Sequence, residues 1–141
     1  LTNIGYHKRN LKVFGGDQLR PNIHIKDMVR AYELLVDTDS NKIDKKIYNV
    51  GDQNISVNDI ALKVKKILGE DLIITKESTN DNRSYHISSQ KIFDDLNFTC
   101  KYKIDDAILD LKNAFEKKLF FNPLENADYY NIKKMQLIKI K

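Results

Sequence analysis

The sequence has little of what several classes of protein require. Its 141 residues contain one cysteine, Cys100, so no internal disulfide can form, and we expect a protein of a reducing compartment such as the cytoplasm. No run of 18 apolar residues occurs, which argues against a transmembrane helix. The histidines and the cysteine show neither HxxxH nor CxxC spacing. We therefore predict no metal site, because zinc needs three or four converging ligands.

Motifs of nucleotide binding and covalent catalysis are also missing. There is no P-loop, no GxGxxG fingerprint and no GxSxG nucleophile elbow. Cys100 has no base nearby in the sequence, and we interpret it as a packed structural thiol. His24 lies between Ile23 and Ile25, and we interpret it as structural rather than as a ligand. No catalytic residue is assigned in this chain.

What is present is typical of one globular domain. Apolar residues make up 41% and charged residues 31% of the chain, and its length supports a single core. The net charge of +4 arises from 24 basic and 20 acidic residues that alternate along most of the sequence. One basic cluster, which we interpret as a solvated helix face, consists of Lys133, Lys134, Lys139 and Lys141. We therefore expect neither a nucleic acid nor a membrane as partner.

The chain begins at Leu1, and its first methionine is Met28. We expect from this that it is a piece of a longer protein.

Apolar spacing predicts alternating strands and helices, and hence an α/β or α+β fold. Strands are expected at residues 11–14, 22–25, 46–50 and 72–75, with a polar loop at 77–83. Helices are expected after Asp27 as N-cap, at 57–68 behind a Ser56–Asp59 capping box, around 92–96, and after Asp105 as N-cap. Residues 123–141 are expected to form a terminal helix or arm.

Two arginines suggest binding of phosphate groups. Arg20 follows the Gly15–Gly16 turn, and Arg83 lies in the second polar loop. A guanidinium matches phosphate oxygens two at a time, so two loop arginines could hold one diphosphate. The alternative is that both side chains are simply solvated.

Three segments then resemble one family. They are FGGDQLRPNIHIKD (14–27), IYNVG with SVNDIA (47–51 and 56–61), and DNRSY with SQK and LNF (81–85, 89–91 and 96–98). In this order and spacing they resemble the NAD-dependent sugar-nucleotide epimerases and dehydratases, which are extended short-chain dehydrogenases/reductases. The resemblance covers residues 11–115. It implies a doubly wound Rossmann-type enzyme whose C-terminal part, residues 1–141 here, includes a smaller mixed α/β substrate-binding lobe.

The resemblance also implies roles for particular residues. Arg20 and Arg83 match the two arginines that contact the substrate diphosphate, and Lys12, Phe14 and Tyr85 fall near the nucleotide. The partner is then a nucleotide diphosphate sugar, the cofactor of the parent enzyme is NAD, and the parent is expected to be a homodimer. The setting implied is synthesis of surface polysaccharide precursors.

The family's N-terminal cofactor loop and its catalytic Tyr-x-x-x-Lys pair have no counterpart upstream of the arginine motif. Tyr129 and Lys133 satisfy that spacing, but they follow every matched segment, so we interpret this match as accidental. We therefore expect the chain alone to be inactive and to bind no NAD. The alternative function is a small stand-alone module that binds an anion or another macromolecule.

Overall fold

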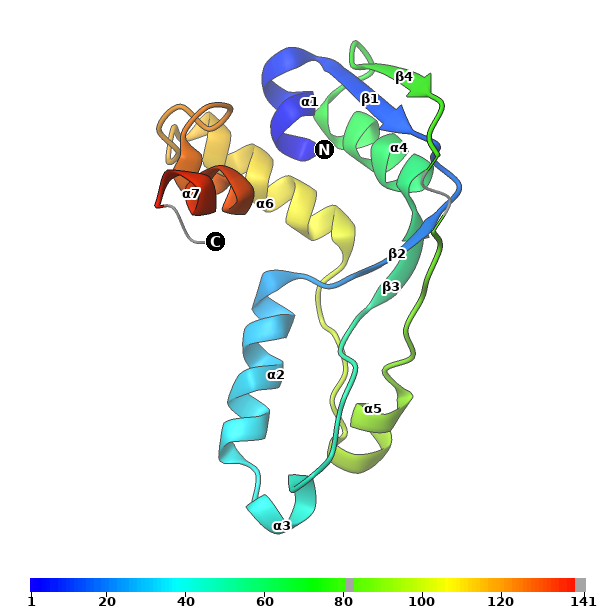
Figure 1. Ribbon diagram of the computed structural model, residues 1–141, viewed down its shortest axis with the longest axis vertical. Coiled ribbons are helices and arrows are strands. Elements are labelled where there is room, and N and C mark those ends of the chain that lie inside the picture. The colour runs from blue at the N-terminus through cyan, green and yellow to red at the C-terminus, as the bar shows by residue number, and fades with distance from the viewer. Residues whose placement is uncertain (81–82, 139–141) are drawn as a thin grey trace.

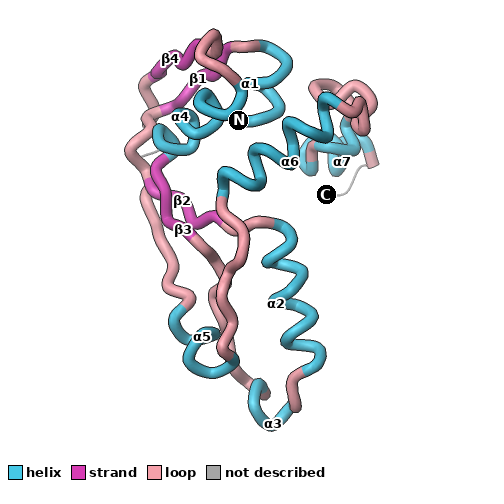
Figure 2. Tube along the Cα trace, turned by 180° about the vertical axis from the view of Figure 1, so that it is seen from behind, coloured by secondary structure: helices cyan, strands magenta, loops and turns pink. Residues whose placement is uncertain are grey.

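The computed structural model describes residues 1–80 and 83–138. The molecule is elongated, with α1, α4, α6 and α7 at one end and α2, α3 and α5 at the other (Figure 1). The strand pair β2–β3 lies between the two ends, as the view from behind also shows (Figure 2). In chain order the elements are α1 (Thr2–Lys8), β1 (Asn10–Phe14), β2 (Leu19–Asn22), α2 (Ile25–Asp37), α3 (Ser40–Ile43), β3 (Gln53–Ser56), α4 (Val57–Leu68), β4 (Ile73–Glu77), α5 (Gln90–Leu96), α6 (Ile104–Glu116), the 3-10 turn η1 (Ala127–Tyr129) and α7 (Asn131–Leu137).

The described strands form two pairs. β1 runs parallel to β4, with Leu11 opposite Ile74, and α4 lies between these strands in the chain order. β2 runs antiparallel to β3, with Arg20 opposite Ile55. One parallel pair and one antiparallel pair, with helices between the strands in the chain, confirm the mixed α/β class predicted from the sequence.

Each end of the molecule has its own apolar cluster. The first cluster packs α4 and α6 against β1 and β4, and its buried members are Leu11, Val13, Ala61, Val64, Leu72 and Ile108. The second packs α2 against α5 and the loop that follows it, and its buried members are Ala31, Ile92 and Phe98. Phe93 on α5 and Leu111 on α6 are exposed to a substantial degree.

Helix α4 begins and ends as its sequence predicts. The Ser56 hydroxyl accepts a hydrogen bond from the main-chain N–H of Asp59 at 3.0 Å, and it donates to the Asp59 carboxylate at 2.7 Å. Gly69 caps the other end with φ at +129°. A positive φ is readily adopted by glycine, which explains why the helix stops there.

The predicted strand at 46–50 is wrong. These residues form no strand, because no described strand lies beside them. Their side chains instead contact α5. The Lys46 ammonium and the Tyr48 hydroxyl both bind the Asp95 carboxylate, at 3.0 and 2.9 Å. The Lys46 hydrogen bond is the largest cause of the lowered pKa of Asp95. Ile47 is left 82% exposed.

Three predicted boundaries are also wrong. The strand expected at 22–25 ends at Asn22, and helix α2 already begins at Ile25. The N-cap of α2 is His24, whose Nδ1 accepts a hydrogen bond from the Lys26 N–H at 3.1 Å. This contact agrees with the structural interpretation of His24. The predicted N-cap, Asp27, lies inside the helix. At α6 the Asp106 carboxylate, rather than Asp105, accepts from the Lys103 N–H at 2.7 Å.

The terminal segment contains the short helix α7, preceded by η1. Residues 81, 82 and 139–141, which include part of the third family segment and two tail lysines, lie outside the described residues. Within the rest of the chain, no helix is long and apolar enough to cross a membrane.

Candidate functional site

A glycine turn carries the chain from β1 to β2 and fixes where β2 begins. Gly16 has φ at +121°, and a Cβ atom there would overlap the side-chain amide of Asn58 at the start of α4. The Gly16 N–H donates to Gln18 Oε1 at 2.6 Å, and the Gly16 carbonyl accepts from the Asn58 N–H at 2.9 Å. The turn is therefore held against α4, and this contact positions the strand that bears Arg20.

We expect Gly16→Ala to lower the free energy of unfolding by more than about 1 kcal/mol, since alanine disfavours this φ and its methyl group meets Asn58. Urea denaturation measures the change. Gly51→Ala is the matched control, because its φ is not positive and the only close approach of its Cβ would be to the end of the Ile87 side chain. Equal stability of the two variants would contradict this account of the turn.

Three of the predicted site residues lie together. Arg20 Nη1 donates a hydrogen bond to the main-chain carbonyl of Arg83 at 2.6 Å. It also donates to the main-chain carbonyl of Leu19, the residue before Arg20, at 2.8 Å. The guanidinium carbon of Arg20 stands 4.9 Å from the centre of the Tyr85 ring, in cation–π geometry. Nε and Nη2 of Arg20 have no partner among the described residues. They form an edge of the guanidinium that can donate to an oxyanion.

The segment after Arg83 runs beside β2 and β3, and side chains hold it there. Ser84 Oγ accepts from the Leu19 N–H at 2.9 Å. Asn54 binds both the N–H and the carbonyl of Ile87, at 3.0 and 2.9 Å. These side-chain bonds replace a strand ladder and keep Arg83 and Tyr85 next to Arg20. Sequence reasoning missed both Ser84 and Asn54.

The other two predicted residues, Lys12 and Phe14, lie on β1. The Lys12 ammonium is 3.3 Å from the Glu77 carboxylate on the neighbouring strand. The Phe14 side chain is exposed at the end of β1, where its carbonyl accepts from Gln18 Nε2 at 2.8 Å. Neither residue forms a hydrogen bond, ion pair or ring contact with Arg20 in the part of the chain that the structure describes, although the glycine turn connects β1 and β2 directly.

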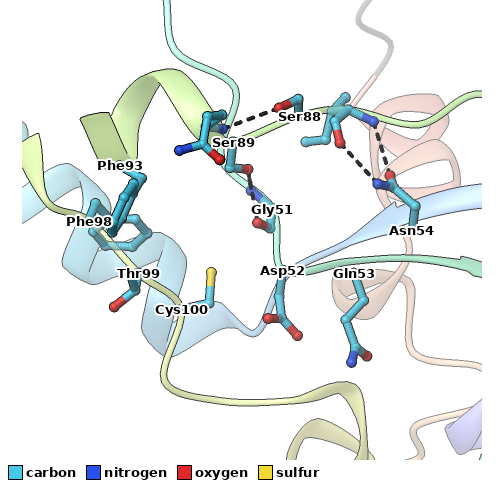
Figure 3. Close-up of a pocket in the computed structure, with 12 residues that line it drawn as sticks. Gly51, Asp52, Gln53, Asn54, Ser88, Ser89, Phe93, Phe98, Thr99 and Cys100 are labelled. Atoms are coloured by element: carbon cyan, nitrogen blue, oxygen red, sulfur yellow. Dashed lines mark hydrogen bonds between the residues drawn. The ribbon is translucent and has the colours of Figure 1, made fainter. Parts of the chain in front are cut away.

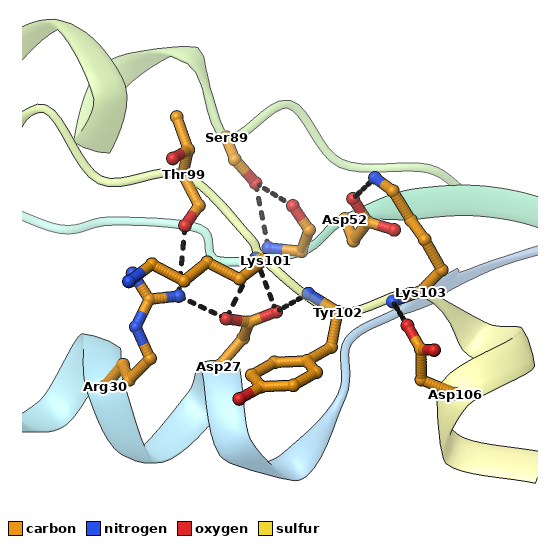
Figure 4. Close-up of polar contacts among 10 residues, drawn as sticks. Asp27, Arg30, Asp52, Ser89, Thr99, Lys101, Tyr102, Lys103 and Asp106 are labelled. Atoms are coloured by element: carbon orange, nitrogen blue, oxygen red, sulfur yellow. Dashed lines mark hydrogen bonds and ion pairs between the residues drawn. The ribbon is translucent and has the colours of Figure 1, made fainter. Parts of the chain in front are cut away.

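The buried carboxylate of Asp27 ties α2 to the loop before α6 (Figure 4). It accepts from the main-chain N–H groups of Lys101, at 3.0 and 3.1 Å, and Tyr102, at 2.9 Å, and it pairs with Arg30. Burial opposes ionisation, but the hydrogen bonds from Tyr102, Lys101 and Arg30 outweigh it and hold the pKa of Asp27 below its ordinary value. Its role is structural, but it acts as the acceptor for this loop and not as the predicted N-cap.

A cavity of about 360 Å³ lies beside this network, between residues 51–54, 87–90 and 98–100 (Figure 3). Ser89 Oγ closes one wall by bonding both the N–H and the carbonyl of Gly51, at 2.8 and 2.9 Å. The Cys100 thiol also lines the cavity, and burial raises its pKa, with the carboxylates of Asp27 and Asp52 adding to the effect. A protonated thiol is a poor nucleophile, which agrees with the structural interpretation of Cys100.

The Tyr129 and Lys133 side chains do not share one helix. Tyr129 ends η1 and packs edge-on against Phe120, whereas Lys133 lies in α7 with its ammonium over the Tyr130 ring, 4.4 Å from the ring centre. Among the described residues, no group of three or more His, Cys, Asp or Glu side chains could hold a metal ion.

The comparison with family models identifies one match. Residues 1–51 match the NAD dependent epimerase/dehydratase family. The matched range includes the first family segment and the beginning of the second, whereas the third lies beyond it. The resemblance deduced from the motifs is confirmed over this part of the chain. No curated protein matches the chain.

Solved structures with the same fold include enzymes of different specificity. The L-threonine dehydrogenase of Phytophthora infestans is 12% identical, with a TM-score of 0.73 over 83% of this chain and 40% of that one. The UDP-glucose 4-epimerase of Thermotoga maritima with UDP-glucose is 22% identical, with a TM-score of 0.69 over 84% and 38%. The dTDP-glucose 4,6-dehydratase of Bacillus anthracis in complex with NAD is 18% identical, with a TM-score of 0.68 over 88% and 40%.

These likenesses confirm the predicted fold class, a fragment of the Rossmann-type epimerase fold with its mixed α/β lobe. The chain spans only 38–40% of the length of these enzymes. At such low identities they establish the fold and leave the substrate open.

Proposed function

We propose that this chain supplies the nucleotide diphosphate sugar-binding part of an NAD-dependent epimerase or dehydratase. Arg20 and Arg83 hold the substrate diphosphate, while Tyr85, Phe14 and Lys12 contact the nucleotide. The observation that carries the proposal is the position of the Arg20 guanidinium, against the main chain of Arg83 and the ring of Tyr85, with one edge without a partner in the described chain. The match to the epimerase/dehydratase family supports it independently.

In this proposal, contacts between Arg20, Arg83 and the substrate diphosphate contribute most of the affinity for the nucleotide sugar. A diphosphate carries about two negative charges, and charge-assisted bonds from a guanidinium fork fit its oxygens in pairs. Anchoring the diphosphate leaves the sugar free to turn, which both epimerisation and dehydration of the sugar need. The hydride chemistry belongs to NAD.

The residues present do not fit NAD itself. A dinucleotide site needs glycines that leave room for a pyrophosphate at a helix N-terminus. The chain has five glycines and one adjacent pair, Gly15–Gly16, and the space at that pair is occupied by the side chains of Gln18, Asn58 and Thr79. We therefore assign NAD to a part of the parent enzyme outside these 141 residues.

We expect the isolated chain to bind no NAD and to turn over no nucleotide sugar. Titration calorimetry with NAD⁺ and a coupled assay with UDP-glucose measure this. A dissociation constant in the low micromolar range for NAD⁺ would contradict the assignment. So would an activity that disappears in Tyr129→Phe, since we give Tyr129 only a packing role.

We further propose that residues 1–141 form one C-terminal substrate-binding region, with residues 123–141 as its terminal arm. The parent enzyme would be a cytoplasmic homodimer that acts in the synthesis of surface polysaccharide precursors. Its Rossmann portion would cover the apolar face of α2 and segment 46–50. The Val36 side chain on that face is 83% exposed, which is close to the exposed fraction of Ile47. Segment 46–50 has no strand neighbour among the described residues, so a strand of the Rossmann portion could pair with it. Sedimentation that shows this chain burying the same face in a stable dimer of its own would contradict the assignment.

The proposal is tested by titrating the chain with UDP-glucose, dTDP-glucose, ADP, a nucleoside monophosphate and inorganic phosphate. We expect the diphosphates to bind more tightly than the monophosphate and inorganic phosphate. The alternative, a stand-alone anion module, predicts comparable binding of all five ligands.

A further inference from the structure

The positive charge of the protein is concentrated in its last segment. Residues 117–141 hold six lysines and two acidic residues, so the net charge of +4 of the whole chain arises there. The 116 residues before it are electrically balanced. Residues 117–138, the part of this segment that the structure describes, are called the C-terminal arm below.

Large apolar side chains of the same arm face solvent. Phe121 is 83% exposed and Ile132 is 74% exposed. The other exposed members of the arm are Leu119, Tyr129, Met135, Leu137 and Ile138. They lie close to lysine pairs along the chain, in the sequences KKLFF (117–121) and IKKMQLI (132–138). An apolar and basic surface of this kind is typical of segments that lie on an anionic membrane surface.

The arm is nevertheless anchored to the rest of the protein. Phe120 packs against Phe115 of α6 and Tyr129 of η1, with ring centres 5.5 and 5.4 Å apart. Asn3 of α1 donates to the Pro123 carbonyl at 2.8 Å. Phe120 therefore faces inward, and its neighbour Phe121 is left in solvent. The folded arm lies at one end of the molecule, remote from α2 and α3 (Figure 1).

Two of the four lysines in the C-terminal arm, Lys117 and Lys118, have no side-chain partner among the described residues. Lys133 rests on the Tyr130 ring. Lys134 alone is paired, with Asp128.

We propose that the C-terminal arm docks this protein on the surface of an anionic lipid bilayer. The lysines meet the lipid phosphates, and Phe121, Ile132 and Leu137 enter the interface between headgroups and acyl chains. Charge decides between the possible occupants. Two copies of the arm would repel each other, because each carries a positive charge. An anionic bilayer instead neutralises the positive charge of the arm. The inference is independent of nucleotide binding, and it is an alternative to the expectations of a solvated helix face and of no membrane partner.

Flotation of the 141-residue chain with vesicles tests the proposal. We expect binding to vesicles of phosphatidylcholine with 30% phosphatidylglycerol, about tenfold or more weaker binding to pure phosphatidylcholine, and release at high salt. Lys117→Gln with Lys118→Gln should weaken binding about tenfold or more, since each lysine near such a surface contributes about a fivefold factor. Phe121→Ser should weaken it as well. Circular dichroism confirms that each variant is folded.

Matched controls lie at the far end of the molecule. Val36→Ser removes an apolar side chain as exposed as Phe121, and Lys42→Gln with Lys45→Gln removes the same charge as the double arm variant. We expect these variants to bind vesicles as the wild type does. Equal binding to both vesicle types would overturn the proposal, and so would equal loss in arm and control variants. A dimer in solution that Phe121→Ser abolishes would also overturn it, in favour of a second copy.

Discussion

Arg20→Ala and Arg83→Ala should each weaken binding of a nucleotide diphosphate sugar by about 10- to 150-fold. Each variant removes charge-assisted hydrogen bonds worth roughly 1.5–3 kcal/mol, and every 1.4 kcal/mol is about a factor of ten in affinity. Arg→Lys should restore part of the loss, because a lysine cannot make the two-pronged contact. Stability should change little at Arg83, which is exposed. Titration calorimetry with UDP-glucose or dTDP-glucose measures the effect.

Arg9→Ala is the matched control for charge. Its guanidinium binds the Asp71 carboxylate and the Leu68 carbonyl. It therefore ties the junction of α1 and β1 to the turn between α4 and β4, and we assign it no contact with substrate. We expect its substrate affinity to equal that of the wild type. If Arg20→Ala and Arg83→Ala also bind substrate as the wild type does, the two arginines are ordinary surface residues and the proposed site is wrong.

Asp27→Ala should lower the free energy of unfolding by about 3 kcal/mol at neutral pH. The change leaves the N–H groups of Lys101 and Tyr102 without their acceptor and Arg30 without its counter-ion, and losses at buried ionic groups reach this size. Urea denaturation followed by circular dichroism gives the value. Asp37→Ala is the control, since this exposed residue ends the same helix.

The pH dependence distinguishes the carboxylate's charge from its shape. The folded-state pKa of Asp27 lies below its unfolded value, so the stabilisation is fully present above the ordinary carboxyl pKa of about 3.9. It is lost as the pH falls through the lower, folded-state pKa. The difference in stability between wild type and Asp27→Asn should therefore be largest near pH 7 and shrink in acid. A difference that stays constant from neutral to acid pH would show that the charge of Asp27 contributes nothing.

Local sequence signals predicted the elements whose causes are local. Helix α4 begins at the Ser56 cap and ends at Gly69 because both signals act through neighbouring main-chain groups. The strand at 46–50 failed because a strand needs a neighbour, and apolar alternation cannot show whether one is present. Tyr48 instead bonds to Asp95, which is distant in the sequence.

The site shows the same division between local and distant causes. The positions of Arg20 and Arg83 came from motif order, and the structure adds that the Arg83 main chain lies against the Arg20 guanidinium. The partners that hold this arrangement, Ser84 and Asn54, bond across 65 and 33 residues of chain. Asp27 was taken for a cap because an aspartate before a helical pattern usually is one. The main-chain N–H groups that its carboxylate binds lie 74 and 75 residues away.

The side chains of the four arginines report directly on whether this chain binds a nucleotide diphosphate sugar through Arg20 and Arg83. Each side chain gives one Nε–H signal in a ¹⁵N NMR spectrum, and the Lys variants assign them. On addition of UDP-glucose or dTDP-glucose, we expect the Arg20 and Arg83 signals to shift together along one binding curve. The signals of Arg9 and Arg30, already engaged with Asp71 and Asp27, should stay in place. If saturating diphosphate sugar moves neither Arg20 nor Arg83, the account is contradicted.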